Sequence, residues 1–405
     1  MPEEALGGKT IRGDKGWDAD GTKSISKETG TGEGRVHMYV MGVDAGGTKT
    51  RCMICDEQER VAGIGEAGAS QHQVYGIQQT KDNLRLAVTR ALDEAGLSLS
   101  DISYAVLGMS GADEKDDFAL LIPAVGEVLR GVPYEVLHDS WIGMRAALGS
   151  APDDCNTAGD GTAPGDCNAA GDGSVPDDCN TTGDGTAPED GNAAGCGGEK
   201  TAMAGVVSIC GTGAGHAGMN SKGEKVTLRN LYYLTGNYGG GGDLYKQALH
   251  YAFRSEEGTY KKSLLEEMVP SVFGVKTMEE VCVMIKNDGP DEKARYQLPI
   301  VVFEAARRGD QVAAALLSDM GREEGFYAAA VIRKLGMTKE RVPAVLIGSL
   351  FQTGEPLLID AYMEQVRAAA PLAYPVILKE QPVVGAVRLA LDHISQQEEC
   401  ADGAE

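Results

Sequence analysis

No stretch of this sequence approaches 18 consecutive apolar residues, the length that a membrane-spanning helix needs. The polar segment 1–37 also lacks the apolar centre of a signal peptide. We therefore predict a cytoplasmic protein with no membrane partner.

The sequence also lacks a stripe of basic residues, since 37 Lys and Arg stand against 60 Asp and Glu, a formal net charge of −23. A protein that binds nucleic acid needs positive charge to meet the phosphates. We therefore expect no nucleic-acid partner. More than half of the negative charge comes from three segments, 1–37, 151–198 and 396–405, and the rest of the chain is only mildly acidic.

The nine cysteines form no regular framework. Only four of them lie outside the repeats and the tail: Cys52, Cys55, Cys210 and Cys282. An odd total that is scattered through hydrophobic runs fits a reducing compartment better than a set of disulfides. Cys52 and Cys55 stand three apart on a predicted strand and so face opposite sides, which makes packing a better reading than a shared metal.

Three segments carry no signal of a packed core. Residues 1–37 are polar and glycine-rich without a helical or strand period, so we predict a disordered head, and Met38 is an alternative start of the chain. Residues 395–405 are predicted to form a disordered tail. Residues 151–198 are four tandem 12-residue units, beginning with APDDCNTAGDGT. Because they lack the acidic residue that a calcium loop places after its glycine turn, we interpret them as a flexible, low-complexity insert.

The rest of the chain alternates between predicted strands and helices, which is typical of an α/β protein. An N-terminal lobe over 38–140 has expected strands at 38–44, 50–56, 60–67, 104–110 and 134–139, and helices at 76–95 and 115–130. A helix expected at 140–148 leads into a C-terminal lobe over 141–382, interrupted by the insert, with expected strands at 205–213, 214–219, 225–229, 343–349 and 374–379 and helix over most of 230–336. The final helix, 383–394, is a candidate to pack back on the N-terminal lobe. Each lobe opens with strand, glycine turn and strand, so the pattern indicates a duplicated architecture.

The first candidate site is the glycine turn Asp44-Ala-Gly-Gly-Thr-Lys-Thr50, between two predicted strands. Gly46 and Gly47 let the backbone curl so that consecutive N–H groups converge on an anion, and Thr48 adds a hydroxyl donor. Asp44, at the end of the strand, is placed to hold a hydrated Mg²⁺. The alternative is a plain hairpin turn, in which Gly-Gly is common.

Two further glycine turns follow apolar strands in the second lobe. Gly211-Thr212-Gly213 stands where the first turn stands in the first lobe, so two facing turns could grip a triphosphate from both sides. Ile347-Gly348-Ser349-Leu350-Phe351 ends another strand, where a nucleotide base could lie against the backbone. Taken alone, the latter is typical of an ordinary strand-to-helix connection.

The fourth candidate site is His138-Asp139-Ser140, at the end of strand 134–139. A carboxylate at the carboxyl end of a strand suits a general base that takes a proton from an alcohol. The alternative makes Asp139 the N-cap of helix 140–148, and the two roles are compatible. We assign no catalytic role to His138.

Together with Leu107-Gly-Met-Ser-Gly-Ala-Asp113, these motifs resemble, in their order, the superfamily of sugar kinases, Hsc70 and actin. Within it they resemble the branch of N-acetylglucosamine kinases and BadF/BadG/BcrA/BcrD-type ATPases. The resemblance covers about residues 38–394 outside the insert. The segments Asn237–Asp243 and Gln381–Ala386 are also similar to that branch.

The resemblance implies two ribonuclease-H-like lobes, as in actin-like ATPases, with an interlobe nucleotide cleft that holds ATP and Mg²⁺. The residues implied to bind the nucleotide are Gly46, Gly47, Thr48, Lys49, Gly211, Thr212, Gly213, Gly348 and Ser349. Asp139 matches the catalytic base of the family, and Asp44 would hold Mg²⁺ through water. Phosphoryl transfer needs mainly alignment and charge neutralisation, which such a set can supply.

The residues implied to contact a sugar are Gln71, His72, Ser110, Asp113, Asn237 and Asp243. The loop from Gly68 reads Gly-Ala-Ser-Gln-His where the family usually has Gly-Pro-Ala/Ser-Asn. The loop from Gly236 reads Gly-Asn-Tyr-Gly-Gly-Gly where many members have Gly-Asp-Glu-Gly-Ser-Gly. These departures leave the identity of the sugar open.

We therefore predict an ATP-dependent kinase that phosphorylates a hydroxyl of an amino sugar such as N-acetylglucosamine or glucosamine. One alternative is a BadF-type ATPase that activates another enzyme, but the sequence lacks its run of cluster-binding cysteines. Another is a non-catalytic regulator that binds a sugar or a nucleotide, but the head shows no helical period for a DNA-binding motif. A homodimer is left open as the assembly.

Overall fold

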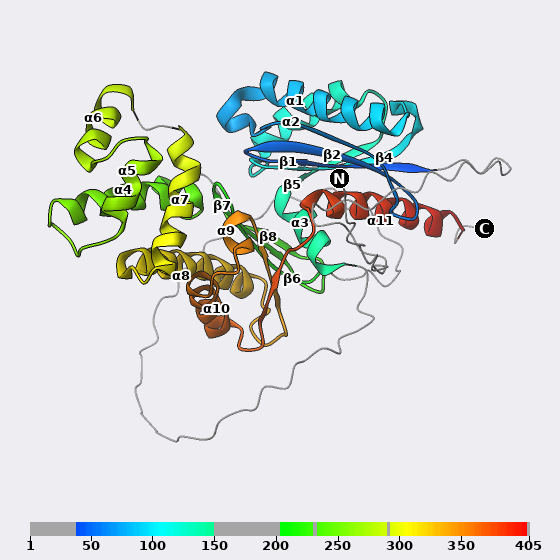
Figure 1. The fold of residues 1–405 in the computed structure, drawn as a ribbon. Coiled ribbons are helices and arrows are strands. Elements are labelled where there is room, and N and C mark those ends of the chain that lie inside the picture. Colours follow the sequence, from blue (N-terminus) through cyan, green and yellow to red (C-terminus); the bar gives the residue numbers. More distant parts are fainter. Residues whose placement is uncertain (1–37, 150–202, 230–232, 290–291, 403–405) are drawn as a thin grey trace, which may run out of the picture. The chain divides into compact units, whose positions relative to one another are not determined.

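A computed structural model describes residues 38–149, 203–229, 233–289 and 292–402 of the chain (Figure 1). The predictions of a disordered head and of a flexible insert at 151–198 lie outside the described residues. Within the described part, no helix is long and apolar enough to cross a membrane.

The first sheet contains five strands in the order β3-β2-β1-β4-β5. They are β1 (Tyr39–Ala45), β2 (Lys49–Asp56), β3 (Val61–Gly68), β4 (Ile102–Met109) and β5 (Tyr134–His138). The strands β1, β2 and β3 pair antiparallel, whereas β4 joins β1 in parallel and β5 joins β4 in parallel. The carboxyl ends of β1, β4 and β5 therefore lie at the same edge of the sheet.

The second sheet repeats this topology, with the order β10-β9-β6-β7-β8. Its strands are β6 (Gly205–Cys210), β7 (Ala214–Met219), β8 (Lys225–Thr227), β9 (Pro343–Ile347) and β10 (Tyr374–Ile377). The strands β6, β7 and β8 pair antiparallel, and β9 and β10 extend the sheet in parallel from β6. The duplicated α/β fold expected from the sequence is confirmed, because each lobe has the ribonuclease-H-like arrangement of actin-like ATPases.

Helices cover both faces of the first sheet (Figure 1). On one face lie α1 (His72–Ala95) and α2 (Lys115–Leu129), and on the other lie α3 (Asp139–Leu148) and α11 (Pro382–Asp402). Successive residues of a strand point to opposite faces, so Met41 and Val43 pack under α1 and α2, whereas Val40 packs toward α11. The last helix of the chain thus completes the core of the first sheet.

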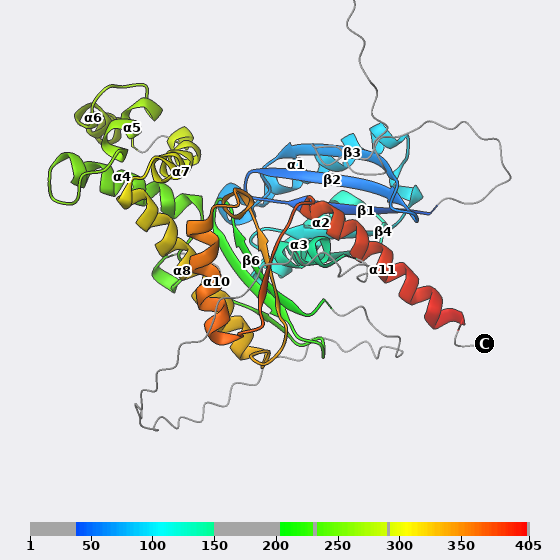
Figure 2. The same ribbon diagram turned by 60° about the horizontal axis from the view of Figure 1, so that its bottom comes forward.

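The second sheet packs against α8 (Gln311–Lys334), which in turn lies along α10 (Pro356–Ala369). Figure 2 shows α4 (Gly241–Glu256), α5 (Leu265–Val272), α6 (Met278–Asp288) and α7 (Glu292–Arg307) grouped near one end of α8. The remaining elements are α9 (Ser349–Gln352) and the short 3-10 helices η1 (Leu99–Asp101) and η2 (Tyr233–Thr235). One apolar cluster contains residues of helices α4 to α10 and of strands β6 and β9.

Several boundaries differ from the expected ones. The helix expected from residue 76 begins at His72, with a kink at Gly76, where φ is 79°. The strand expected over 205–213 ends at Cys210, because Gly211–Gly213 form the turn to β7. The prediction of a disordered tail from residue 395 is wrong, because α11 continues to Asp402. The segment beyond residue 394 is polar, so it carries no periodic apolar signal, yet its Gln and Glu residues are good helix formers.

Candidate active site

Asp139 is the first residue of α3 and follows directly after β5. The N-cap of α3 is His138, whose Nδ1 lies 3.2 Å from the backbone nitrogen of Ser140. The alternative in which Asp139 is the N-cap is therefore wrong, and its carboxylate contacts His138, Ser110 and the backbone N–H of Ser140. The side chain of Asp139 is 21% exposed and is hydrogen-bonded to Ser110, which follows β4.

Two acidic groups at this edge of the sheet, Asp44 and Asp139, have raised pKa values. Burial, and then the negative charge of Asp139, raises the pKa of Asp44 to about 7, against opposing effects of Lys49 and Arg51. Burial also raises the pKa of Asp139, and Asp113 adds to this effect while His138 opposes it. A carboxylate whose pKa moves toward neutrality is a better proton acceptor than a solvated one.

His138 lies between two carboxylates. Its Nε2 is 3.0 Å from Oδ1 of Asp113, and its Nδ1 is 3.2 Å from Oδ1 of Asp139. Burial lowers the pKa of His138, but the charge of Asp139 and the hydrogen bond and charge of Asp113 raise it overall. The side chains of His138 and Asp113 are almost fully buried, at 4% and 3% exposed, so this contact is a fixed part of the structure.

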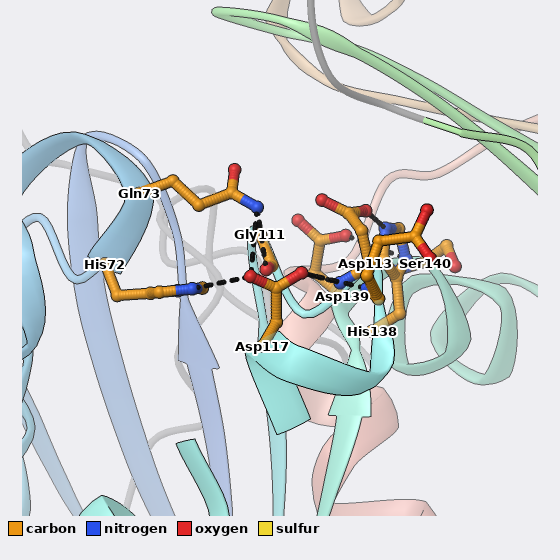
Figure 3. A network of polar contacts seen from close by, with 9 residues as sticks. His72, Gln73, Gly111, Asp113, Asp117, His138, Asp139 and Ser140 are labelled. Atoms are coloured by element: carbon orange, nitrogen blue, oxygen red, sulfur yellow. Dashed lines mark hydrogen bonds and ion pairs between the residues drawn. The ribbon is translucent and has the colours of Figure 1, made fainter. Parts of the chain in front are cut away.

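The polar contacts continue from Asp113 to the first turn of α1 (Figure 3). Oδ2 of Asp117 accepts the backbone N–H groups of Asp113 at 3.3 Å and of Glu114 at 2.9 Å. Oδ1 of the same carboxylate is 2.9 Å from Nε2 of His72 and accepts the side-chain amide of Gln73 at 3.3 Å. Asp117 thus ties the loop that was expected to contact the sugar to the loop that holds Asp113.

The glycine turn between β1 and β2 is held by its own backbone and by the loop after β3. The N–H of Gly46 donates to the carbonyl of Lys49 at 2.9 Å, and the carbonyl of Gly46 accepts the N–H of Ser70 at 3.1 Å. The side chain of Gln71 lies beside Gly47, because a Cβ atom at Gly47 would be 3.0 Å from its Oε1. Gln71 is therefore next to the proposed phosphate turn as well as next to His72.

Two glycine turns of the second lobe meet at the start of α4. The N–H of Gly241 donates to the carbonyl of Gly211 at 2.7 Å, and the N–H of Gly242 donates to that of Thr212 at 2.9 Å. A Cβ atom at Gly240, where φ is 75°, would lie 2.5 Å from the carbonyl carbon of Gly213. This approach requires glycine, so the turn after β6 is fixed by α4.

The turn after β9 lies against the turn after β6. Gly348 has a φ of 101°, and a Cβ atom there would lie 2.4 Å from the carbonyl oxygen of Cys210. Only glycine fits such a backbone conformation at such a distance. The residues Gly211 and Gly348, expected to act on one nucleotide, are therefore in direct backbone proximity.

A cavity of about 310 Å³ opens beside these turns. Its floor includes Gly211, Thr212 and Ser349, and its walls come mainly from α7. The α7 residues that line it are Arg295, Tyr296, Pro299, Ile300, Phe303 and Arg307. Its size and its apolar walls with a few polar groups are typical of a small-molecule site.

Three further residues were expected to contact a ligand: Asp243 and Asn237 the sugar, and Lys49 the nucleotide. Asp243 accepts the N–H of Gly239 at 3.1 Å and pairs with Lys246 at 2.8 Å, so it holds the loop before α4. Asn237 is half-buried in that loop. Lys49 is mostly exposed, with Nζ 3.7 Å from Glu66. The assignments of Asn237, Asp243 and Lys49 to ligand binding stay predictions.

Sequence reasoning missed the lining of the cavity and the role of Asp117. The cavity is formed by residues of α7 that no local motif marks, although Tyr296 and Ile300 are large apolar side chains left exposed on that helix. Such exposure on a helix is a usable signal only once the fold is known. Asp117 lies in the first turn of α2, where an acidic residue is common for helix stability alone.

The fold and this site define a class: a two-lobed protein of the actin-like ATPase type, with a glycine turn at the edge of each sheet and acidic groups beside the turn of the first. The sequence model of the BadF/BadG/BcrA/BcrD ATPase family matches residues 41–120, which confirms the resemblance for that part of the first lobe.

Curated relatives match most of the chain. An N-acetylmuramic acid/N-acetylglucosamine kinase of Clostridium acetobutylicum is 23% identical over 87% of this chain and 98% of its own length. An N-acetyl-D-glucosamine kinase of Dictyostelium discoideum is 21% identical over 87% of this chain and 97% of its own length. The solved structure of a candidate N-acetylglucosamine kinase from Chromobacterium violaceum is 20% identical with a TM-score of 0.57, and the match covers 88% of this chain and 100% of that one. The structural likeness supports the fold.

Proposed function

We propose that the protein is an ATP-dependent kinase that transfers the γ-phosphoryl group to a hydroxyl of an amino sugar, such as N-acetylglucosamine or glucosamine. The observation that carries the proposal is the position of Asp139, which follows a parallel strand, is not the N-cap of α3 and has a carboxylate with a raised pKa. The two curated relatives, which are named as kinases of N-acetylated sugars, support the class of substrate.

In this proposal ATP binds to the glycine turn of the first lobe and to the glycine turns of the second lobe. The base and ribose would enter the cavity beside α7, and the phosphates would run along Gly211–Gly213. The backbone N–H groups and the hydroxyl of Thr48 on the β1–β2 turn would hold the γ-phosphate from the other lobe. Backbone donors suit this task because they stabilise negative charge without a mobile side chain.

The residues at the edge of the first sheet fit a Mg²⁺ ion. Asp44 is a partly buried carboxylate beside a second carboxylate, and its pKa is raised to about 7 by burial first and by the negative charge of Asp139 second. In the described part of the chain, no cluster of three or more acidic, histidine or cysteine side chains could enclose a metal. This suits Mg²⁺, which is commonly bound by one or two carboxylates together with substrate phosphates and water. When bound, the ion would neutralise charge on the phosphates.

Asp139 would accept the proton of the attacking hydroxyl. Its raised pKa favours this transfer, and its hydrogen bond with Ser110 restricts its orientation. The loop that contains Gln71 and His72 would define one wall of the sugar site, because contacts through Asp117 tie His72 to Asp113. The longer Gln71, where the family usually has Asn, would then alter which sugar substituents fit.

The activator ATPase is less well supported. Cys52, Cys55 and Cys210 are buried, and Cys282 is exposed. Buried thiols cannot hold a cluster at a surface shared with a second subunit. Assembly as a homodimer, the cytoplasmic location and the lack of a nucleic-acid partner stay predictions.

The test is an assay of ADP release with N-acetylglucosamine, glucosamine, glucose and no sugar. We expect release that depends on an amino sugar, and a fall in kcat of about 10²–10⁴-fold in Asp139→Asn, because an amide cannot accept the proton. Asp116→Asn, which removes an exposed carboxylate on α2, should match the wild type. ATP hydrolysis that needs no sugar and is unchanged in Asp139→Asn would contradict the proposal.

A further inference from the structure

The contact between His138 and Asp139 suggests more than helix capping. An N-cap needs only a side-chain oxygen or nitrogen that accepts one N–H of the first turn, and Asn, Asp, Ser and Thr do this well. Nδ1 of His138 lies 3.2 Å from the backbone nitrogen of Ser140, as in a cap, but the ring also reaches Asp113 on one side and Asp139 on the other. A cap alone would not need the second nitrogen.

The proton on Nε2 of His138 can be assigned from its partner. An ionised carboxylate only accepts hydrogen bonds, so at 3.0 Å from Oδ1 of Asp113 the Nε2 atom carries the proton and donates it. This contact fixes the ring plane, because both side chains are almost fully buried. Asp113 is itself held through its backbone N–H by Asp117. The ring is therefore anchored by a chain of contacts that begins in α2.

The other ring nitrogen faces the candidate base. Nδ1 lies 3.2 Å from Oδ1 of Asp139 and 2.7 Å from Oγ of Ser140. Asp139 is the more exposed of the two carboxylates that contact the ring, at 21% against 3% for Asp113. With a carboxylate at each ring nitrogen, the ring is favoured in its charged form, in which Nδ1 also carries a proton and donates to Oδ1 of Asp139. The buried carboxylate thus anchors the ring, and the ring limits the orientations of the accessible one.

We propose that His138 is a positioning residue for the reaction: anchored by Asp113, its imidazole holds the carboxylate of Asp139 in the orientation that meets the substrate hydroxyl. This inference rests on the proposed function for its catalytic consequence, because Asp139 must be the base. The geometric part, that His138 restricts Asp139, stands independently. Positioning of a reacting group within a fraction of an ångström has a large effect on rate.

The decisive variant is His138→Asn, because Asn is an excellent N-cap and leaves α3 capped. Its shorter side chain cannot bridge Asp113 and Asp139. We expect kcat to fall about tenfold or more, while the KM values for ATP and sugar and the melting temperature stay near those of the wild type. If His138 serves only as a cap, kcat will be unchanged, and the proposal is overturned. The same substitution at His250, exposed on α4, is the control.

Two further variants separate positioning from general destabilisation. Asp113→Ala removes the anchor and should lower kcat about as much as His138→Asn does, and the double variant should be no slower than either, since both act through one contact. His138→Asn added to Asp139→Asn should cause no further loss, because the residue to be positioned is already removed. If the fold-losses in kcat of the single variants multiply in the double variants, the proposal is contradicted.

A crystal structure of His138→Asn without ligands gives a readout that does not depend on activity. We expect the Asp139 carboxylate to leave its single orientation or to occupy more than one. An unchanged, single orientation would overturn the proposal even if no sugar were phosphorylated. Conversely, if the wild type shows no sugar-dependent turnover but Asp139 moves in the variant, the proposed function fails and the positioning role holds.

Discussion

The two sheets share one topology but carry different chemistry at equivalent places. In the first lobe, the ends of β1 and β5 and the loop after β4 carry three carboxylates, those of Asp44, Asp139 and Asp113. In the second lobe, the turns after β6 and β9 carry Gly211 and Gly348. The duplicated fold therefore places turns at the corresponding edge of each sheet, and the residues at each edge determine its chemistry.

This difference has an electrostatic reason. A triphosphate is strongly negative, so carboxylates around all of it would oppose binding. The carboxylates proposed for the reaction are gathered in the first lobe beside its own glycine turn, where a cation and a transferred proton can offset them, and the second lobe adds further backbone donors and a largely apolar cavity. The comparison predicts that variants of the first lobe mainly change the rate, whereas variants of the second mainly change the binding of ATP.

The largest effect that would test this division is expected from Asp44→Asn. Loss of the carboxylate proposed to hold Mg²⁺ should lower kcat/KM about 10²–10³-fold, and excess Mg²⁺ should restore little of it. Steady-state kinetics over a Mg²⁺ titration measure both. An Asp44→Asn enzyme with wild-type rates and Mg²⁺ dependence would show that the acidic edge does not bind the metal.

The same variant should have the opposite effect on stability. Because the pKa of Asp44 is raised from 3.8 to about 7, the folded protein keeps a proton between these pH values that the unfolded chain has lost. Stability therefore falls as pH rises from about 4 to 7. Asp44→Asn lacks this loss of folding stability. The shift in pKa sets an upper limit of about 4 kcal/mol on the loss, and partial exposure of the carboxylate makes the actual loss smaller. Urea unfolding without ligands should show that the advantage of Asp44→Asn is larger at pH 8 than at pH 5.

In the second lobe, Gly348→Ala should raise the KM for ATP about tenfold or more and lower the melting temperature. The new Cβ would meet the backbone of Cys210 and would also occupy an unfavourable positive φ. Gly336→Ala is the matched control, since its φ is 70° but its Cβ meets nothing within 4 Å. Equal losses in the two variants would mean that only the backbone strain matters, and not the approach of the two turns.

A smaller effect is expected from Ile300→Glu. Ile300 lines the cavity beside α7 and is 67% exposed, so the change should leave folding intact. A carboxylate in the pocket proposed for adenosine should raise the KM for ATP several-fold, with kcat nearly unchanged. Ile122→Glu, a similarly exposed position on α2, should change neither constant. Equal kinetics in the two variants would place the nucleotide elsewhere.

The sequence predicted the frame and the turns well, because both depend on local signals. Short apolar runs indicated the strands, and glycines at strand ends indicated the turns that meet around Gly211 and Gly348. The acid at position 139 was also identified locally, from its place after a strand.

What the sequence could not predict depends on contacts between distant segments. His138, and not Asp139, caps α3, and only the three-dimensional arrangement shows the anchor from Asp113, 25 residues earlier in the chain. The cavity wall on α7 has no local motif, since its residues become neighbours of Ser349 only after folding. The continuation of α11 to Asp402 lacked a periodic apolar pattern.

The position of α11 has a consequence for how the chain is made. Val383 and Val387 fill the face of the first sheet that contains Val40, although more than 340 residues separate them in sequence. During synthesis, strands β1 to β5 emerge long before α11. The part of the sheet face that α11 covers therefore stays exposed until α11 has left the ribosome. We expect ribosome-bound chains that stop before residue 382 to expose this face to chaperones, and a protein truncated there to lose the first lobe as well as its last helix.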